Sequence, residues 1–241
     1  INLLIDTVLA SFLPTGSVSW LYYAERLTEL PLGVFGIAIA TVILPGLSRE
    51  YSTRSPDEFR HTLDWAIKMI LLIALPATLA LVLLAAPILD TLFGYGAMSR
   101  RDVSMASLSL AAMALGLPAF MLIKVLATAY YSRQDTRTPV IIGIKAMVAN
   151  MGLNLLFVIP LHHLWQVGHV GLSLATTLAA YLNAGLLLLG LLQREVYRPE
   201  PGLRLLGRLH PLREDQGGAH REGRPPPVAR RALSFVHRVL F

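Results

Sequence analysis

The sequence has no cysteine and few charged residues. Cysteine is missing from all 241 positions, which excludes disulfides, thiolate metal sites and cysteine nucleophiles. Charged residues make up only 15% of the chain, against about 25% in an ordinary soluble protein. The zinc-protease, serine-hydrolase and phosphate-loop motifs are missing too. The sequence therefore predicts a protein that is not an enzyme.

Hydrophobic residues, in contrast, are abundant. They account for 54% of the chain, and the mean hydropathy is +0.57. Disordered chains have the opposite composition, with low hydrophobicity and high charge. Several apolar stretches reach the roughly 20 residues needed to cross a bilayer core of about 30 Å. The composition predicts an all-α fold, a polytopic transmembrane helical bundle.

The net charge of +6 belongs mostly to the C-terminal end. Residues 1–201 contain 13 basic and 12 acidic residues, whereas residues 202–241 contain 8 and 3. A basic tail is suited to nucleic acid or anionic lipid, but this one has a single aromatic residue, Phe235, between its arginines and no nucleic-acid motif. We expect no nucleic-acid partner and a basic, disordered cytoplasmic tail over residues 202–241. An out-of-frame end fits the same composition.

Hydrophobic runs predict six helical segments in residues 1–201. The first covers residues 1–13, about 20 Å of helix at 1.5 Å per residue, which is too short to cross. We therefore expect the sequence to begin inside a helix and to be a fragment. The other segments give about five full spans in addition to this partial one: 17–47, 59–93, 103–131, 138–159 and 170–192.

Arginine positions predict the orientation of these spans, because positively charged loops stay in the cytoplasm. Arginines follow the second, fourth and sixth segments, whereas the loops at 14–16 and 161–168 carry none. Arg100 and Arg101, beside Asp102, are the exception. The C-terminal ends of the second, fourth and sixth segments are thus expected in the cytoplasm.

A polar stripe with an arginine lies on the second segment. Ser19, Tyr22, Arg26, Glu29 and Gly33 recur at spacings of 3, 4, 3 and 4, which places them on one helical face. An arginine at membrane depth is costly and points to function, and its planar fork suits phosphate or pyrophosphate. The alternative is an internal ion pair of Arg26 with Glu29 or Glu25 that holds helices together.

A second group of polar residues predicts a cation site. Asn150 and Asn154 share one helical face, while Asp6 and Thr177 lie on other segments. Oxygen ligands from three helices suit Na⁺, a hard cation. The alternative is hydrogen bonding between helices, which is common for Asn and Thr in membranes.

Three lysines and a histidine pair were considered as further sites. Lys68, Lys124 and Lys145 lie within a turn or two of cytoplasmic ends, where lysine side chains reach the interface. Lys124 is the deepest and remains a candidate to face a cavity. His162 and His163 lie in a predicted loop and offer no set of His and carboxylate ligands, so we expect no metal there.

Several long motifs in residues 1–202 identify a family. They are Asp6–Leu13, Gly16–Leu27, Glu29–Gly33, Ile39–Ser48, Lys124–Ala127, Tyr131–Pro139 and Gly171–Ala175. Together they resemble the MurJ (MviN) family of bacterial lipid II flippases. The resemblance implies the fourteen-helix, MATE-like fold of the MOP transporter superfamily, in which two six-helix lobes surround a central cavity. Residues 1–201 match its second, C-terminal lobe, from a partial helix seven through helix twelve, and the first lobe would be a missing partner.

The resemblance also implies roles for individual residues. Arg26 matches an arginine that faces the pyrophosphate and sugar head group of lipid II, with Ser19, Tyr22, Glu29 and Lys124 as further substrate-binding candidates.

The second implied site is for an ion. Asp6, Asn150, Asn154 and Thr177 fall near a Na⁺ site of some members, so Na⁺ is the expected coupling ion and no other cofactor is expected.

The function expected from these motifs is transport. Lipid II, the undecaprenyl-pyrophosphate-linked precursor, would move from the inner to the outer leaflet of the bacterial plasma membrane by alternating access, among membrane lipids. Two alternatives remain open. One is a truncated, non-transporting membrane fragment, and the other is a related exporter of drugs or polysaccharide-linked lipid.

Overall fold

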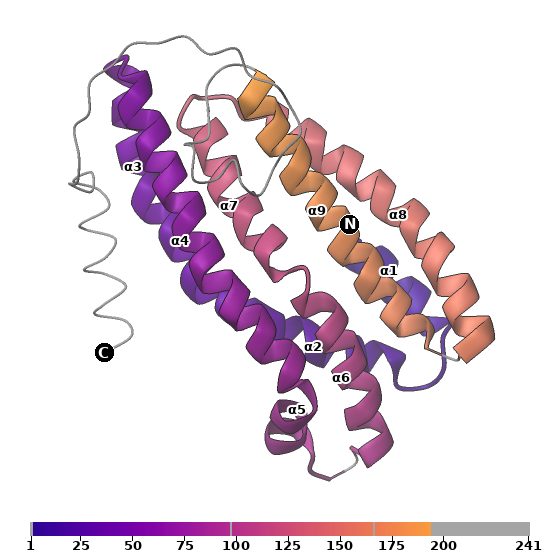
Figure 1. The fold of residues 1–241 in the computed structure, drawn as a ribbon. Helices are drawn as coiled ribbons and strands as arrows, with labels where there is room; N and C mark the ends of the chain where they lie inside the picture. Colours follow the sequence, from indigo (N-terminus) through magenta and orange to yellow (C-terminus); the bar gives the residue numbers. More distant parts are fainter. Residues whose placement is uncertain (1, 97, 166, 194–241) are drawn as a thin grey trace.

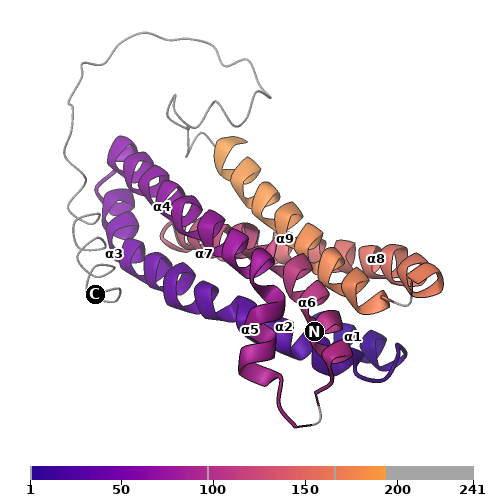
Figure 2. The same ribbon diagram turned by 60° about the horizontal axis from the view of Figure 1, so that its bottom comes forward.

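The fold was analysed in a computed structural model, which describes residues 2–96, 98–165 and 167–193. Within those residues every regular element is a helix, and the helices form one elongated bundle (Figures 1 and 2). They are α1 (Asn2–Ser11), α2 (Ser17–Pro31), η1 (Leu32–Ile37), α3 (Ala38–Ser52), α4 (Pro56–Leu83), α5 (Ala85–Phe93), α6 (Arg100–Ala114), α7 (Leu117–Tyr131), α8 (Arg137–Trp165) and α9 (Gly168–Gln193). The predicted tail over residues 202–241 lies outside the described residues.

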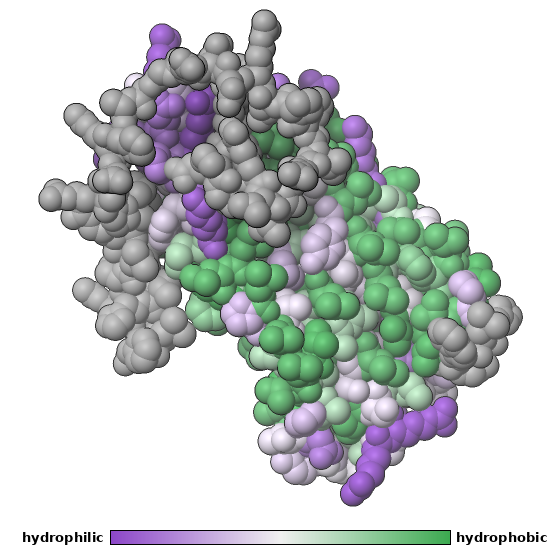
Figure 3. Space-filling model, viewed as in Figure 1, coloured by the Kyte–Doolittle hydropathy of each residue, from purple (hydrophilic) through white to green (hydrophobic). Residues whose placement is uncertain are grey.

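The helices of the described residues include four that are long and apolar enough to cross a membrane. A fifth span is added if the bent pair of α6 and α7 is counted as one. Figure 3 shows a broad apolar region over the middle of one face, with hydrophilic residues toward both ends. With the ten-residue α1 as the partial helix, the expected all-α transmembrane fold of about five spans is confirmed.

The second span runs farther than its hydrophobic pattern predicted, from Ser17 to Ser52. Its middle, Leu32–Ile37, is a π-helix that follows Pro31. Proline has no backbone N–H to donate and its ring crowds the preceding turn. The N–H of Leu32 bonds the carbonyl of Glu29, three residues earlier, and the wider π-helix that follows continues the span without a break.

The third predicted segment, residues 59–93, was wrong as a single helix. It is divided into α4 and α5 at Leu84, whose backbone leaves the helical region at φ −103° and ψ 12°. Pro87 is the third residue of α5, where its missing N–H costs no helical bond. The break at Leu84 therefore lies three residues ahead of the proline, in the turn that its ring would otherwise obstruct.

The fourth predicted segment is also interrupted, by a 40° bend between α6 and α7. Pro118 is the second residue of α7 and cannot donate to the end of α6. Two hydroxyls of α9 compensate: Thr177 donates to the carbonyl of Ala112 and Tyr181 to that of Leu115, each at 2.8 Å. Neighbouring side chains that satisfy freed carbonyls make such a bend tolerable in a membrane.

The last two spans pack along each other. α8 continues past Pro160 to Trp165, so the predicted loop at 161–168 was wrong over most of its length. Gly171 allows the close approach, because a Cβ there would lie 3.0 Å from the backbone of Phe157.

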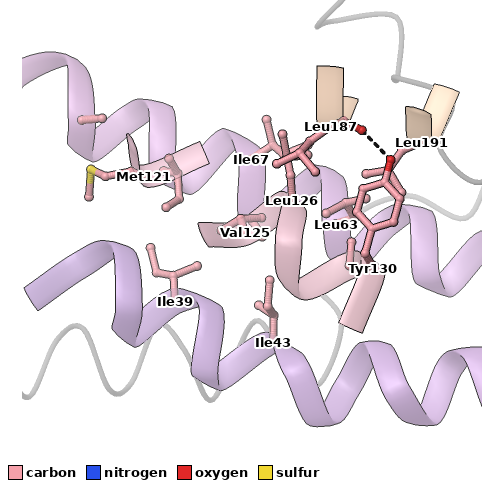
Figure 4. Packing of buried hydrophobic residues seen from close by; sticks show 14 of the residues in the cluster. Ile39, Ile43, Leu63, Ile67, Met121, Val125, Leu126, Tyr130, Leu187 and Leu191 are labelled. Atoms are coloured by element: carbon pink, nitrogen blue, oxygen red, sulfur yellow. Dashed lines mark hydrogen bonds between the residues drawn. The ribbon is translucent and has the colours of Figure 1, made fainter. Parts of the chain in front are cut away.

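The main hydrophobic core lies between α3, α4, α7 and α9 (Figure 4). Ile43, Leu63 and Leu126 are at most 1% exposed in it. Tyr130 is fully buried in the same cluster, and its hydroxyl donates to the carbonyl of Leu187 at 2.8 Å. This bond ties α7 to α9 and leaves no polar group of Tyr130 unsatisfied. A second core joins α2, α5 and α6 around Trp20, Leu27, Leu89 and Leu110.

Candidate functional site

The predicted polar stripe lies on one open face of the second span. Ser19, Tyr22, Arg26, Glu29 and Gly33 are all exposed. A Cβ at Gly33 would meet no atom within 4 Å, so the open face continues into η1. The helix spacing seen in the sequence is therefore realised as a continuous open face, while Trp20, Ala24 and Leu27 on the opposite side of α2 are buried.

Arg26 is held within its own helix. Its Nη1 lies 2.8 Å from Oε2 of Glu29, and its guanidinium lies 5.1 Å from the centre of the Tyr22 ring. The side chains of Arg26 and Glu29 are 59% and 49% exposed. The ion pair expected as an alternative is thus present, and Glu29 forms it. Because the pair lies on the open face, it orients the guanidinium but does not hold two helices together.

Lys124 is exposed on α7, at a different level of the bundle from Arg26. The two levels are related through Met121, whose side chain packs beside Gly36 of η1. Arg26 lies ten residues before Gly36, and Lys124 lies three residues after Met121. At about 1.5 Å of rise per residue, Lys124 and Arg26 are therefore about 20 Å apart along the bundle. Lys68, in contrast, pairs with Asp64 on its own helix at 2.5 Å.

Three of the four predicted cation ligands come together where α1, α8 and α9 meet. Asn154 Nδ2 donates to Asp6 Oδ1 at 2.7 Å and lies 3.3 Å from Asn150 Oδ1. Asn150 Nδ2 in turn lies 3.4 Å from the hydroxyl of Thr176. The cluster therefore combines one carboxylate, two amides and a hydroxyl from three helices.

The prediction for Thr177 requires correction. Its hydroxyl donates to the carbonyl of Ala112 in α6, and Thr176 takes the place expected for it in the cluster. Successive residues of a helix point about 100° apart, so only one of two adjacent threonines faces α8.

The cluster has a free oxygen. Asn154 is fully buried, and its Oδ1 has no hydrogen-bond partner among the described residues. A buried carbonyl oxygen without a partner is costly, since it has lost water without replacement. The donor set is rich in neutral oxygens, and the described residues contain no group of three His, Cys, Asp or Glu able to hold a metal. Such a set suits a hard monovalent cation better than a transition metal.

A polar contact that the sequence reasoning missed joins α2 to α6. The indole N–H of Trp20 donates to Asp102 Oδ1 at 3.0 Å, and the buried ring of His169 lies edge-on at 4.8 Å between centroids. Asp102 is also held by Ser99 in a capping box at the start of α6. The Ser-x-x-Asp spacing was a readable signal for that cap.

Comparison with known proteins identifies the family. The family model described as "Lipid II flippase MurJ" matches residues 1–208. A probable lipid II flippase MurJ of Vibrio cholerae is 55% identical over 197 residues, covering 82% of this chain and 36% of the relative. That of Haemophilus influenzae is 54% identical over 203 residues, covering 82% and 38%. The chain thus spans well under half the length of these relatives, and the family expected from the motifs is confirmed.

Solved structures agree with the fold. An inward closed lipid II flippase MurJ superposes with a TM-score of 0.72 at 28% identity, covering 82% of this chain and 40% of that one. An inward-facing MATE family multidrug transporter of the MOP superfamily gives 0.60 at 14% identity, covering 83% and 46%. The second likeness shows the fold alone.

Proposed function

Since the chain belongs to the lipid II flippase MurJ family, we propose that it forms a substrate-binding lobe of a lipid II transporter. It is a multi-pass protein of the bacterial plasma membrane, with four or five apolar spans. The cargo is the undecaprenyl-pyrophosphate-linked precursor, which moves from the inner to the outer leaflet by alternating access. The role is transport rather than catalysis.

The observation that carries the proposal is the exposure of Arg26 on an apolar spanning helix. Its side chain is 59% exposed on the polar face of α2. A cation facing hydrocarbon there would be very unfavourable, so the face must line water or substrate in the assembled transporter. The cavity would be completed by the part of the relatives' length that this chain does not match.

The residues of the face have distinct tasks in this proposal. Arg26 binds pyrophosphate oxygens through its planar fork, which carries five N–H donors. Tyr22 limits the motion of the guanidinium by stacking on it. Ser19 offers a hydroxyl about two turns from Arg26, on the side of the helix N-terminus. Lys124 would bind the head group at a second level nearer the cytoplasm.

We also propose that the cluster at Asp6 binds the coupling ion. Na⁺ would take the carboxylate of Asp6 and the side-chain oxygens of Asn150 and Asn154, with Thr176 replacing the expected Thr177. The free Oδ1 of Asn154 supports this assignment, because a cation would satisfy it. Packing by hydrogen bonds alone leaves that oxygen without a partner.

The test of the substrate role uses a chimera, because transport by relatives involves a longer chain. The 197 residues that match the Vibrio cholerae relative would replace its own segment. Arg26→Ala should abolish growth complementation of a strain depleted of its own flippase, with membrane protein levels unchanged. Arg26→Lys should rescue only partly, since it restores the charge and not the fork. Full complementation by Arg26→Ala would refute the substrate role.

The proposed ion site at Asp6 is tested separately, by thermal unfolding. Na⁺ should raise the thermal midpoint of the chain in nanodiscs above the value in equal K⁺, because an ion bound only to the folded state stabilises it. Asp6→Asn should remove that difference. An unchanged Na⁺ response in Asp6→Asn would assign the cluster to helix packing.

The two alternative functions make different predictions. A non-transporting fragment predicts that the chain alone fails to complement, whereas the unmodified chimera restores growth. A drug or polysaccharide exporter predicts complementation of that transport instead, and the likeness to the MATE transporter, at 14% identity, supports only the shared fold.

A further inference from the structure

We propose that Glu29 is the displaceable counter-ion of Arg26: it neutralises the arginine in the empty transporter and gives way to the pyrophosphate of the substrate. This inference rests on the proposed function and changes the role of Glu29 from substrate ligand to competitor. It concerns the step in which the empty site returns to the inner leaflet.

The geometry of the Arg26–Glu29 pair allows another anion to replace the carboxylate of Glu29. Glu29 and Arg26 are three residues apart on α2, and their contact joins Nη1 to one carboxylate oxygen. The fork keeps donors for a second acceptor, because a guanidinium carries five. Both side chains are about half exposed, and exposed pairs of this kind are weak. A pyrophosphate, with more charge and more oxygens than one carboxylate, is able to displace Glu29.

The same geometry explains why a counter-ion is needed. During alternating access the site passes from one side of the membrane to the other with substrate and returns without it. The loaded site is neutralised by pyrophosphate. As the cavity closes around the empty site and loses water, an unpaired Arg26 would become costly. Glu29 removes that charge and, because it is on the same helix, travels with Arg26 as part of one rigid element.

Re-pairing also favours release. When one phosphate oxygen leaves Arg26, the tethered carboxylate of Glu29 is already within bonding distance. A tethered competitor acts at a high effective concentration. Substrate therefore dissociates faster than it would from an arginine without a neighbouring acid.

The test measures binding of inorganic pyrophosphate to the whole chain in nanodiscs of zwitterionic lipid, by titration calorimetry. Glu29→Gln should bind about two- to fivefold more tightly than wild type, the gain expected from removing a weak competing pair. Glu25→Gln is the matched control, since it removes the same charge from the adjacent half-buried position. It should change affinity by less. Arg26→Gln should bind weakly, and adding Glu29→Gln to it should restore nothing.

The outcomes separate the two proposals. Unchanged or weaker binding in Glu29→Gln overturns the counter-ion role, and an equal gain in Glu25→Gln overturns it in favour of bulk charge. If wild type and Arg26→Gln bind pyrophosphate equally, the substrate role of Arg26 fails, and the counter-ion role with it. A further support would come from the chimera in liposomes: Glu29→Gln should complete a first transport cycle and then slow at least severalfold, because the return of the empty site is impaired. Undiminished repeated transport would contradict the proposed return step.

Discussion

Replacing Gly190 by alanine should destabilise the bundle through a single atom, the hydroxyl of Tyr130. An added Cβ at Gly190 would overlap that hydroxyl, whereas the next atom of the ring, Cζ, would lie at an ordinary 3.6 Å. Tyr130 is fully buried and bonded to the carbonyl of Leu187, so it has no free space to move into. Overpacking of this kind costs about 1–3 kcal/mol.

The hydroxyl itself contributes less than the overlap costs. Tyr130→Phe removes one interhelical hydrogen bond, worth about 0.6 kcal/mol in membrane proteins. It leaves no unsatisfied donor, because the hydroxyl is deleted. In the double variant Gly190→Ala with Tyr130→Phe, the overlapping atom is gone, so the loss should return to about 0.6 kcal/mol. The coupling energy between the two sites is then about −1 to −3 kcal/mol.

Unfolding in mixed detergent and sodium dodecyl sulfate micelles, followed by tryptophan fluorescence, would measure these four free energies. Gly185→Ala is the control on the same helix, because a Cβ there meets no atom within 4 Å. It should be neutral or mildly stabilising, as expected of alanine in a helix. Additive losses in the double variant would show that the overlap does not involve the hydroxyl, and the packing described between α7 and α9 would be wrong.

Three further outcomes are expected. Cysteine at Thr53 should react only with a membrane-permeant thiol reagent, whereas cysteine at Thr15 should react with an impermeant reagent added outside; reversed labelling would invert the topology. Trp20→Phe keeps an aromatic ring but loses the larger indole and its bond to Asp102, so the unfolding free energy should fall by at least about 0.5–1.5 kcal/mol, the contribution of the hydrogen bond; no change would show that this contact does not stabilise the fold. Thr177→Val should raise amide exchange at the α6–α7 bend above that in α9, and equal exchange would show that the bend is stable without the hydroxyl.

Proline positions illustrate how far the sequence predicted the spans. The hydrophobic pattern located all of the spans, but it did not predict which prolines end a helix. Pro31 and Pro76 lie inside helices, whereas Pro87 and Pro118 lie within the first three residues of new ones. The difference depends on whether a neighbour satisfies the freed carbonyl and whether the chain has room to bend. Neither property is local, so the breaks became visible only in the packed structure.

In the candidate site, too, features within one helix could be predicted from the sequence, whereas contacts between helices could not. The stripe around Arg26 follows from spacing on one helix, and its exposure agrees with that spacing. The choice between Thr176 and Thr177 depends on how α9 is rotated against α8, which spacing within α9 does not determine. The bond from Trp20 to Asp102 joins residues 82 positions apart. Only the fold brings such residues together.

The π-helix at Leu32–Ile37 also sets the rotational phase between the two halves of the second span. A π turn accommodates about one more residue than an α turn, so it offsets the rotation of everything on either side by about 100°. Deleting one residue from this segment would restore regular α-helix and keep the span apolar. Because the π turn absorbs that residue, the outer half would keep its rotation relative to the core around Ile43, and Arg26 would stay on the open face. Inserting one further residue as regular α-helix would instead turn the outer half by about 100° and carry Arg26 toward its neighbours. One-residue insertions here should therefore be more harmful than one-residue deletions, although no side chain of the segment bonds to the site.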